Sequence, residues 1–132
     1  LLHVFFLLGT QINDPENKHP EYRKEEVSEK HLARLEATQE ALEGELKMPT
    51  AFIISASTEV AAEVDVLATV ARDLERSLVR LSEAVPGFAG VHVLAFINRV
   101  SDYFFVVARY LEKGEHRTVD YGVLDERGRG II

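Results

Sequence analysis

Apolar residues recur at helical spacing along three long segments, and the polar positions between them predict how each segment packs. From about residue 26 to 47 one apolar stripe separates charged residues, which indicates a helix on the surface of the protein. From about 58 to 85 the apolar positions alternate in steps of four and three, a heptad seam typical of helices that pack at shallow angles. From about 90 to 113 most of the helix circumference is apolar, which predicts burial on several sides.

The apolar positions of each segment fall into continuous rows. The stripe of the first segment consists of Leu32, Leu35, Leu42 and Leu46. The seam of the second consists of Val60, Val64, Leu67, Ala71, Leu74, Leu78, Leu81 and Val85. The third carries two seams: Leu94, Ile97, Ser101, Phe104, Ala108 and Leu111 form one, and Val93, Phe96, Val100, Tyr103, Val107 and Tyr110 form the other. The pattern predicts an all-α fold, an antiparallel up-and-down helix bundle.

Capping and breaking residues mark the expected helix ends. The opening LLHVFFLLG begins in mid-pattern, so we expect the last two turns of a helix that ends at Gly9 and whose N-terminal part is missing. Ser57 or Thr58 is the expected N-cap of the second long helix. Gly114 is expected to end the third.

The rest of the chain is predicted to lie outside the long helices of a single domain, residues 1–132. Asn-Asp-Pro and His-Pro in residues 10–24 favour a mobile loop. The C-terminal tail, 115–132, is expected to be an extended strap or disordered. Alternating strand patterns are almost absent from the chain.

Composition excludes several functional classes. The formal net charge of −7 disfavours nucleic acid as a partner, because phosphate neutralisation needs surplus lysine and arginine. The chain has no cysteine, which excludes disulfides and thiolate chemistry and fits a cytoplasmic protein. The five histidines show no metal-ligand spacing. The charges within the third long segment argue against a membrane span.

Polar residues interrupt the apolar surface of the third long helix along one stripe. Asn98, Asp102, Phe105 and Arg109 share this face, and Arg99 lies beside it. In one interpretation Asp102 pairs with an arginine of this helix or of a neighbouring helix, and the stripe is structural. In the other, Asn98 and the arginines face a ligand cavity.

The second long helix has its own polar stripe, which contains Asp65, Thr69, Arg72, Glu75 and Arg76. The two arginines are one turn apart, so their guanidinium groups can converge on one anion while the glutamate orients them. The alternative is a solvated face with ion pairs between neighbouring turns.

The two stripes together resemble motifs of the PduO-type ATP:corrinoid adenosyltransferases. The stretch FINRVSDYFFVVARY, 96–110, is similar to the family's Asn-Arg-Leu-Ser-Asp-Tyr motif, and TVARDLER, 69–76, is similar to its arginine-rich motif. The stretch FIISAST, 52–58, occupies the place of the family's Phe-Ile-Leu-Pro-Gly-Gly-Ser/Thr.

The resemblance implies a five-helix, ferritin-like bundle that assembles as a homotrimer with active sites between subunits. It implies transfer of the 5′-deoxyadenosyl group of ATP, bound with Mg²⁺, to the cobalt of a reduced corrinoid, cob(I)alamin, with release of triphosphate. Carried over residue by residue, it implies that Arg72, Glu75, Arg76 and Asn98 contact the nucleotide and that Phe52 packs on the corrin. No residue is implied as a chemical catalyst or a protein metal ligand.

Several positions depart from the family pattern. Ser55, Ala56 and Ser57 replace the Pro-Gly-Gly, Ala68 and Asp73 replace arginines, and Asp65 replaces a histidine. The glycine- and threonine-rich ATP loop of the family does not occur in residues 1–132, so it either precedes Leu1 or is lacking. The departures favour an alternative, a diverged non-catalytic trimeric bundle that binds corrinoid or nucleotide without turnover.

Overall fold

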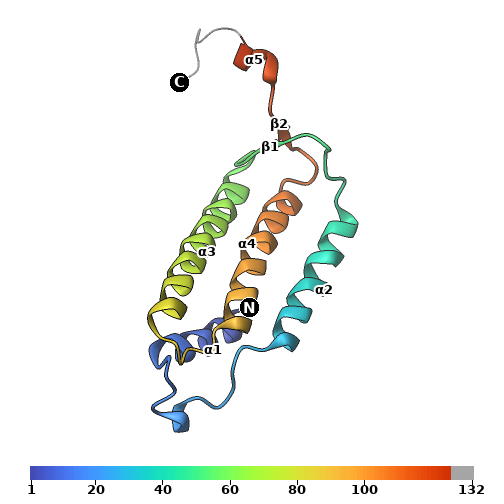
Figure 1. The fold of residues 1–132 in the computed structure, drawn as a ribbon. Coiled ribbons are helices and arrows are strands. Elements are labelled where there is room, and N and C mark those ends of the chain that lie inside the picture. Colours follow the sequence, from blue (N-terminus) through green and yellow to red (C-terminus); the bar gives the residue numbers. More distant parts are fainter. Residues whose placement is uncertain (126–132) are drawn as a thin grey trace.

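Three long helices lie side by side with α4 in the middle, α3 on one side and α2 on the other, in a computed structural model that describes residues 1–125 (Figure 1). In chain order the elements are α1 Leu2–Asn13, a 3-10 turn η1 Pro20–Tyr22, α2 Glu29–Glu45, β1 Ile53–Ile54, α3 Glu59–Ala84, α4 Val91–Leu111, β2 Arg117–Thr118 and α5 Tyr121–Asp125. The shorter α1 crosses the end of this layer opposite to β1 and β2. The predicted all-α class, with three long helices and the end of another, is confirmed.

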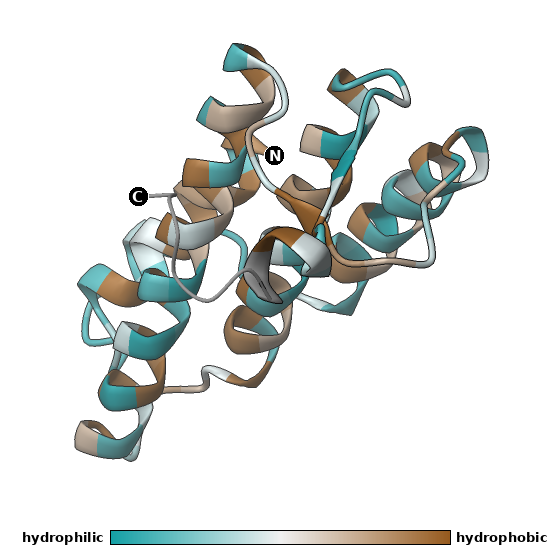
Figure 2. Cartoon of the chain, turned by 90° about the horizontal axis from the view of Figure 1, so that it is seen from above, coloured by the Kyte–Doolittle hydropathy of each residue, from teal (hydrophilic) through white to brown (hydrophobic). Residues whose placement is uncertain are grey.

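The central position of α4 explains why so much of its surface is apolar. Val93, Phe96, Ile97 and Val100 are all at most 1% exposed and form the middle of the core. The ring of Phe5 on α1 meets Phe96 edge-on, with centroids 6.5 Å apart. Figure 2, seen from the β1–β2 end, shows hydrophobic and hydrophilic residues alternating around each helix. This pattern is typical of helices that pack against one another on one side and face water on the other.

The length and composition of α4 would also suit a membrane span. In this fold, however, α4 is packed between α2 and α3. It also holds Arg109, whose side chain is fully buried among protein groups. Packing on two sides and a buried arginine are features of a core helix. The length and hydropathy of such a helix can equal those of a membrane span.

The heptad seam predicted for α3 is correct only in its C-terminal half. Ala71 and Leu78 are buried, whereas Val60 is 55% and Leu67 46% exposed. In the N-terminal half α3 instead turns a smaller and more polar face toward α4, on which Ala61 is fully buried. An ion pair between Asp65 of this face and α4 accompanies the change, so polar contacts override the apolar periodicity here.

The first helix continues past Gly9, where it was predicted to end. Leu8 and Gln11 are both buried on α1, and the side-chain carbonyl of Gln11 accepts a hydrogen bond of 2.7 Å from the backbone N–H of Val27. A glycine within a helix costs only about 1 kcal/mol relative to alanine, so these contacts are sufficient to extend the helix. It ends at Asn13, before Asp14 and Pro15.

Replacing Gly9 with alanine should therefore stabilise the protein by up to about 1 kcal/mol, because a methyl group there meets nothing within 4 Å and alanine favours the helix. The matched control is Gly114→Ala, which should destabilise, since Gly114 has φ +86°. Urea unfolding measures both changes. A loss of stability in the Gly9 variant would contradict a helix that runs through this residue.

The segment between α1 and α2 has more local order than a featureless loop. The carboxylate of Asp14 accepts hydrogen bonds from the backbone N–H groups of Lys18, at 2.9 Å, and His19, at 2.7 Å, before the 3-10 turn. Helix α2 starts at Glu29, three residues later than predicted, because the backbone N–H of Ser28 donates to Nδ1 of His31 in a capping box.

The N-cap of α3 is Thr58, one of the two predicted candidates, and its Oγ1 accepts from the backbone N–H of Ala61 at 3.2 Å. Just before it, β1 pairs antiparallel with β2, a sheet too short to give an alternating signal in the sequence. The tail therefore includes a strand and the short α5, and the part of the predicted strap at 126–132 lies outside the described residues.

Candidate functional site

Three of the predicted site residues meet in one cluster between α3 and α4. The guanidinium of Arg72 donates to Glu75 Oε2 at 3.1 Å, and the side-chain amide of Asn98 donates to the other oxygen, Glu75 Oε1, at 2.7 Å. Residues Arg72 and Glu75 are one turn apart on α3, whereas Asn98 projects from the facing turn of α4. Glu75 therefore orients both an arginine and an amide, one from each helix.

The same cluster extends across α4 to α2. Asp102 accepts from Arg72 at 2.9 Å and from Arg99 at 3.5 Å, and Arg99 in turn donates to Glu36 of α2 at 3.1 Å. Of the partners considered for Asp102, the structure selects Arg99 together with Arg72 of the neighbouring helix. Arg109 pairs elsewhere. Three long helices are thus joined by one chain of polar contacts.

The cluster keeps unused capacity for hydrogen bonding. Arginine offers five N–H donors, and the contacts with Glu75 and Asp102 use two of them. The side chain of Arg72 is 43% exposed, and Asn98 is also exposed. An anion can therefore approach the guanidinium without dismantling the helix packing, while the two carboxylates hold it in one orientation.

Arg76 and Phe52 do not join this cluster. Arg76 forms an ion pair with Asp73 on the outer surface of α3 and is 62% exposed. Phe52 is 75% exposed, and its backbone carbonyl accepts from the N–H of Val119 at 2.9 Å beside the short sheet. The convergence of Arg72 and Arg76 on one point, which their spacing suggested, is therefore absent from the described protomer.

A second polar cluster is buried at the β1–β2 end of the bundle. The guanidinium of Arg109 is fully buried and donates to Asp65 Oδ2 at 2.6 Å and to Glu112 Oε1 at 2.9 Å. His116 Nδ1 lies 2.7 Å from Glu112 Oε2, and the guanidinium stacks 4.9 Å from the ring centre of Phe105. We refer to Asp65, Arg109, Glu112 and His116 as the Arg109 cluster.

The sequence interpretation did not single out Glu112 or His116 as part of a site. Their spacing carried a signal, because Arg109, Glu112 and His116 follow one another at intervals of three and four residues. Gly114 was expected to end the helix between Glu112 and His116. A shared helix face was therefore not expected for these two residues.

The environment of Glu112 predicts a pH dependence of stability. Burial raises the pKa of Glu112, but the hydrogen bond from His116, the charge of Arg109 and the backbone N–H of Ser57 outweigh it and hold the pKa below its ordinary value of 4.5. A lowered folded-state pKa means that ionised Glu112 stabilises the fold above the unfolded-state value. This contribution is lost as the pH falls through the folded-state value.

The substitution Glu112→Gln should therefore flatten the change in urea unfolding midpoint over the interval that starts near the ordinary pKa of 4.5 and runs to lower pH. The unchanged protein should lose stability steadily over that interval. Equal slopes for the two proteins would show that Glu112 does not titrate in this way.

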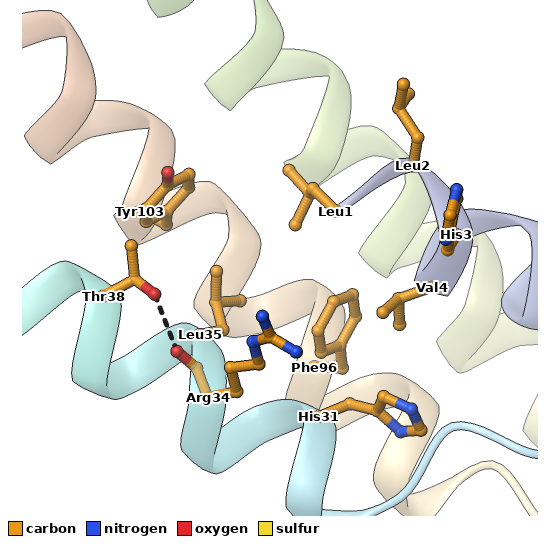
Figure 3. Close-up of a pocket in the computed structure, with 10 residues that line it drawn as sticks. All are labelled: Leu1, Leu2, His3, Val4, His31, Arg34, Leu35, Thr38, Phe96 and Tyr103. Carbon is orange, nitrogen blue, oxygen red and sulfur yellow. Dashed lines mark hydrogen bonds between the residues drawn. The ribbon is translucent and has the colours of Figure 1, made fainter.

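A separate pocket of about 530 Å³ opens between α1, α2 and α4, and Figure 3 shows its lining. Its walls are largely apolar, with Leu35 and Phe96 at its base and Arg34 and His31 along the side formed by α2. None of the five predicted site residues borders it. Across residues 1–125 no group of three or more acidic, histidine or cysteine side chains is arranged to hold a metal ion.

Comparison with known proteins places the fold and these motifs in a family. The profile of the family described as "Cobalamin adenosyltransferase" matches residues 1–111. A corrinoid adenosyltransferase from Mycobacterium leprae is 30% identical over 97 residues, 74% of this chain and 51% of the relative. The corrinoid adenosyltransferase PduO from Citrobacter freundii is 31% identical over 117 residues, 88% of this chain and 33% of the relative. The chain thus spans between a third and about half of these relatives.

Similar solved structures come from the same family. A variant PduO-type ATP:corrinoid adenosyltransferase from Lactobacillus reuteri, complexed with cobalamin and ATP, superposes with a TM-score of 0.76 at 26% identity, over 89% of this chain and 63% of that one. Another variant of that enzyme, complexed with ATP, gives the same TM-score. The profile match covers most of the sequence, and the fold is shared. The chain therefore belongs to the cobalamin adenosyltransferase family.

Proposed function

We propose that this protein transfers the 5′-deoxyadenosyl group of ATP to the cobalt of a reduced corrinoid and releases triphosphate. The observation that carries the proposal is the Arg72–Glu75–Asn98 cluster. In it, residues of the two motifs that resemble the family, 69–76 on α3 and 96–110 on α4, contact each other. Family membership and the neighbours complexed with cobalamin and ATP support the same activity.

In this proposal the protein binds and orients the substrates, and the reactivity comes from the corrinoid. Cobalt(I) attacks the 5′ carbon of ATP, so a cobalt–carbon bond forms while the carbon–oxygen bond to the triphosphate breaks. Arg72 binds phosphate oxygens through its free donors, and Asn98 offers its amide to the nucleotide. Glu75 positions both groups, and Mg²⁺ enters with the nucleotide as its counter-ion.

Two further residues complete the proposed site. Arg76 lies one turn beyond Arg72 and reaches the phosphates by releasing its exposed pairing with Asp73, an ion pair of small energetic value. Phe52 packs on the corrin, and its 75% exposure leaves a large apolar ring free for such a contact. Cobalt(I) is readily oxidised, and the chain has no cysteine, so we place the reaction in the cytoplasm.

The experiment is a turnover assay with ATP, Mg²⁺ and cob(I)alamin generated by a chemical reductant under anaerobic conditions. We expect the absorbance to change to that of adenosylcobalamin, with one triphosphate released for each corrinoid converted. Tight binding of the corrinoid without any conversion would overturn the proposed activity and favour the non-catalytic alternative.

We also propose that the protein works as a homotrimer with sites shared between subunits. Apolar residues on the N-terminal half of α3 lie exposed in the protomer: Val60 at 55%, Val66 at 59%, Leu67 at 46% and Val70 at 55%. Several exposed apolar side chains on one side of a helix are typical of an interaction face. Sedimentation equilibrium should give three times the 14.8 kDa protomer mass. A protein that remains a monomer at assay concentrations would contradict a shared site.

A further inference from the structure

The Arg109 cluster does more than neutralise buried charge, because its two carboxylates also hold the loop that precedes α3. Asp65 Oδ2, which binds Arg109, also accepts from the backbone N–H of Ala56 at 3.0 Å. Glu112 Oε1, the other acceptor of Arg109, lies 3.3 Å from the backbone N–H of Ser57 and accepts from it as well. Two successive N–H groups of the loop are therefore bound by two carboxylates that one buried arginine aligns.

The loop needs such a constraint, because its conformation is unfavourable for its sequence. Ala56 has φ +66°, in the left-handed region that costs a residue with a Cβ roughly 1 kcal/mol or more. In this conformation both N–H groups reach a carboxylate, and these two hydrogen bonds offset the strain. A strained backbone that the surroundings over-determine is a common feature of functional loops.

The chain on both sides of the loop is tied to the same structure. Phe52 and β1 come immediately before it, and β1 pairs with β2. Ser57 Oγ lies 3.3 Å from the backbone N–H of Arg117 and accepts from it, which links the loop to β2. His116 precedes β2 directly and contacts Glu112. One buried cluster thus ties the loop, the strand pair and the backbone at Phe52 to α3 and α4.

We propose that the Arg109 cluster is a positioning device that holds loop 55–57, with Ala56 at positive φ, and thereby sets the place of Phe52 for corrinoid binding. The role of Phe52 in corrinoid binding rests on the proposed function. The hydrogen bonds that hold the loop are present in the structure itself. The cluster acts only by positioning Phe52. None of its members, Asp65, Arg109, Glu112 and His116, touches a reacting atom.

The test uses Asp65→Ala, which removes one arm of the clamp and leaves Arg109 paired with Glu112. Asp73→Ala is the matched control on the same helix, since Asp73 is exposed and forms only a surface pair. Amide hydrogen exchange at Ala56, whose acceptor is removed, should accelerate by about tenfold or more in the first variant and not in the control. Unchanged exchange at this amide would overturn the clamp.

Titration with cob(II)alamin and with ATP supplies the readout that a merely structural role would not change. Asp65→Ala should weaken corrinoid binding by about tenfold, as for a lost hydrogen bond to a charged acceptor, while ATP binding stays unchanged. Adding Ala56→Gly should recover part of that loss, because glycine adopts positive φ freely. Equal weakening of both ligands, or no recovery with glycine, would overturn the positioning role.

The clamp on the loop and the role of Phe52 in corrinoid binding can be disproved independently. If the unchanged protein binds ATP but no cob(II)alamin, the proposed function and the role of Phe52 are both wrong. The amide exchange rates of the Asp65 variant then still decide whether the Arg109 cluster clamps the loop.

Discussion

Replacing Arg72 with alanine is expected to weaken ATP binding by about 10- to 100-fold, the range for the loss of charge-assisted hydrogen bonds. Arg72 is half exposed, lies at the junction of α3 and α4, and retains donors beyond those used by Glu75 and Asp102. Calorimetric titration of the protein with ATP and Mg²⁺ measures the change. Corrinoid binding should be nearly unaffected, because Phe52 directly precedes β1 and its carbonyl binds Val119 next to β2, at the sheet end of the bundle.

The matched control is Arg80→Ala, which removes an exposed arginine two turns further along the same helix. Its effect on ATP affinity should be small, since it alters the overall charge by the same amount without touching the cluster. If both variants lost affinity equally, a diffuse electrostatic attraction would explain the binding and the proposed contact at Arg72 would be wrong.

Replacing Arg109 with alanine should cause the largest loss of stability of any single arginine in the described bundle. The side chain is fully buried between Asp65 and Glu112, so its removal leaves two carboxylates without their cation. Breaking a buried ion pair in this way costs about 3–5 kcal/mol. Urea unfolding followed by circular dichroism should show this decrease in the free energy of unfolding.

Arg76→Ala provides the comparison, because Arg76 also pairs with an aspartate but does so at the surface. Its loss should cost less than about 1 kcal/mol. A similar small cost for the Arg109 variant would mean that its carboxylates find other partners, and the cluster would then not determine the local structure.

The long helices were predictable because their apolar rows are continuous and their packing follows from them. The apolar circumference of α4 predicted burial on several sides, and α3 and α2 cover two of them. The end of α1 was not predictable from Gly9, since the contact that extends the helix is the tertiary bond between Gln11 and Val27. The exposure of Val60 and Leu67 was missed for a related reason, because α3 follows its polar contacts with α4.

The candidate site was predicted in part. Spacing placed Arg72 and Glu75 on one face, and the family resemblance supplied Asn98. The structure brings Asn98 to Glu75 and adds Asp102 from α4. Which of the possible partners Asp102 selects depends on the rotation of α3 against α4, and periodicity along a single helix carries no information about that rotation. The Arg109 cluster was not predicted as a unit, since it is assembled from α3, the end of α4 and the residues after it.

Binding of the nucleotide at the Arg72–Glu75–Asn98 cluster can be tested by a crystal structure of the protein with ATP and Mg²⁺. We predict phosphate oxygens within hydrogen-bonding distance of the Arg72 guanidinium, with Glu75 still bound to Asn98. A nucleotide bound elsewhere, for example in the pocket between α1 and α2, with the cluster unchanged, would contradict this prediction.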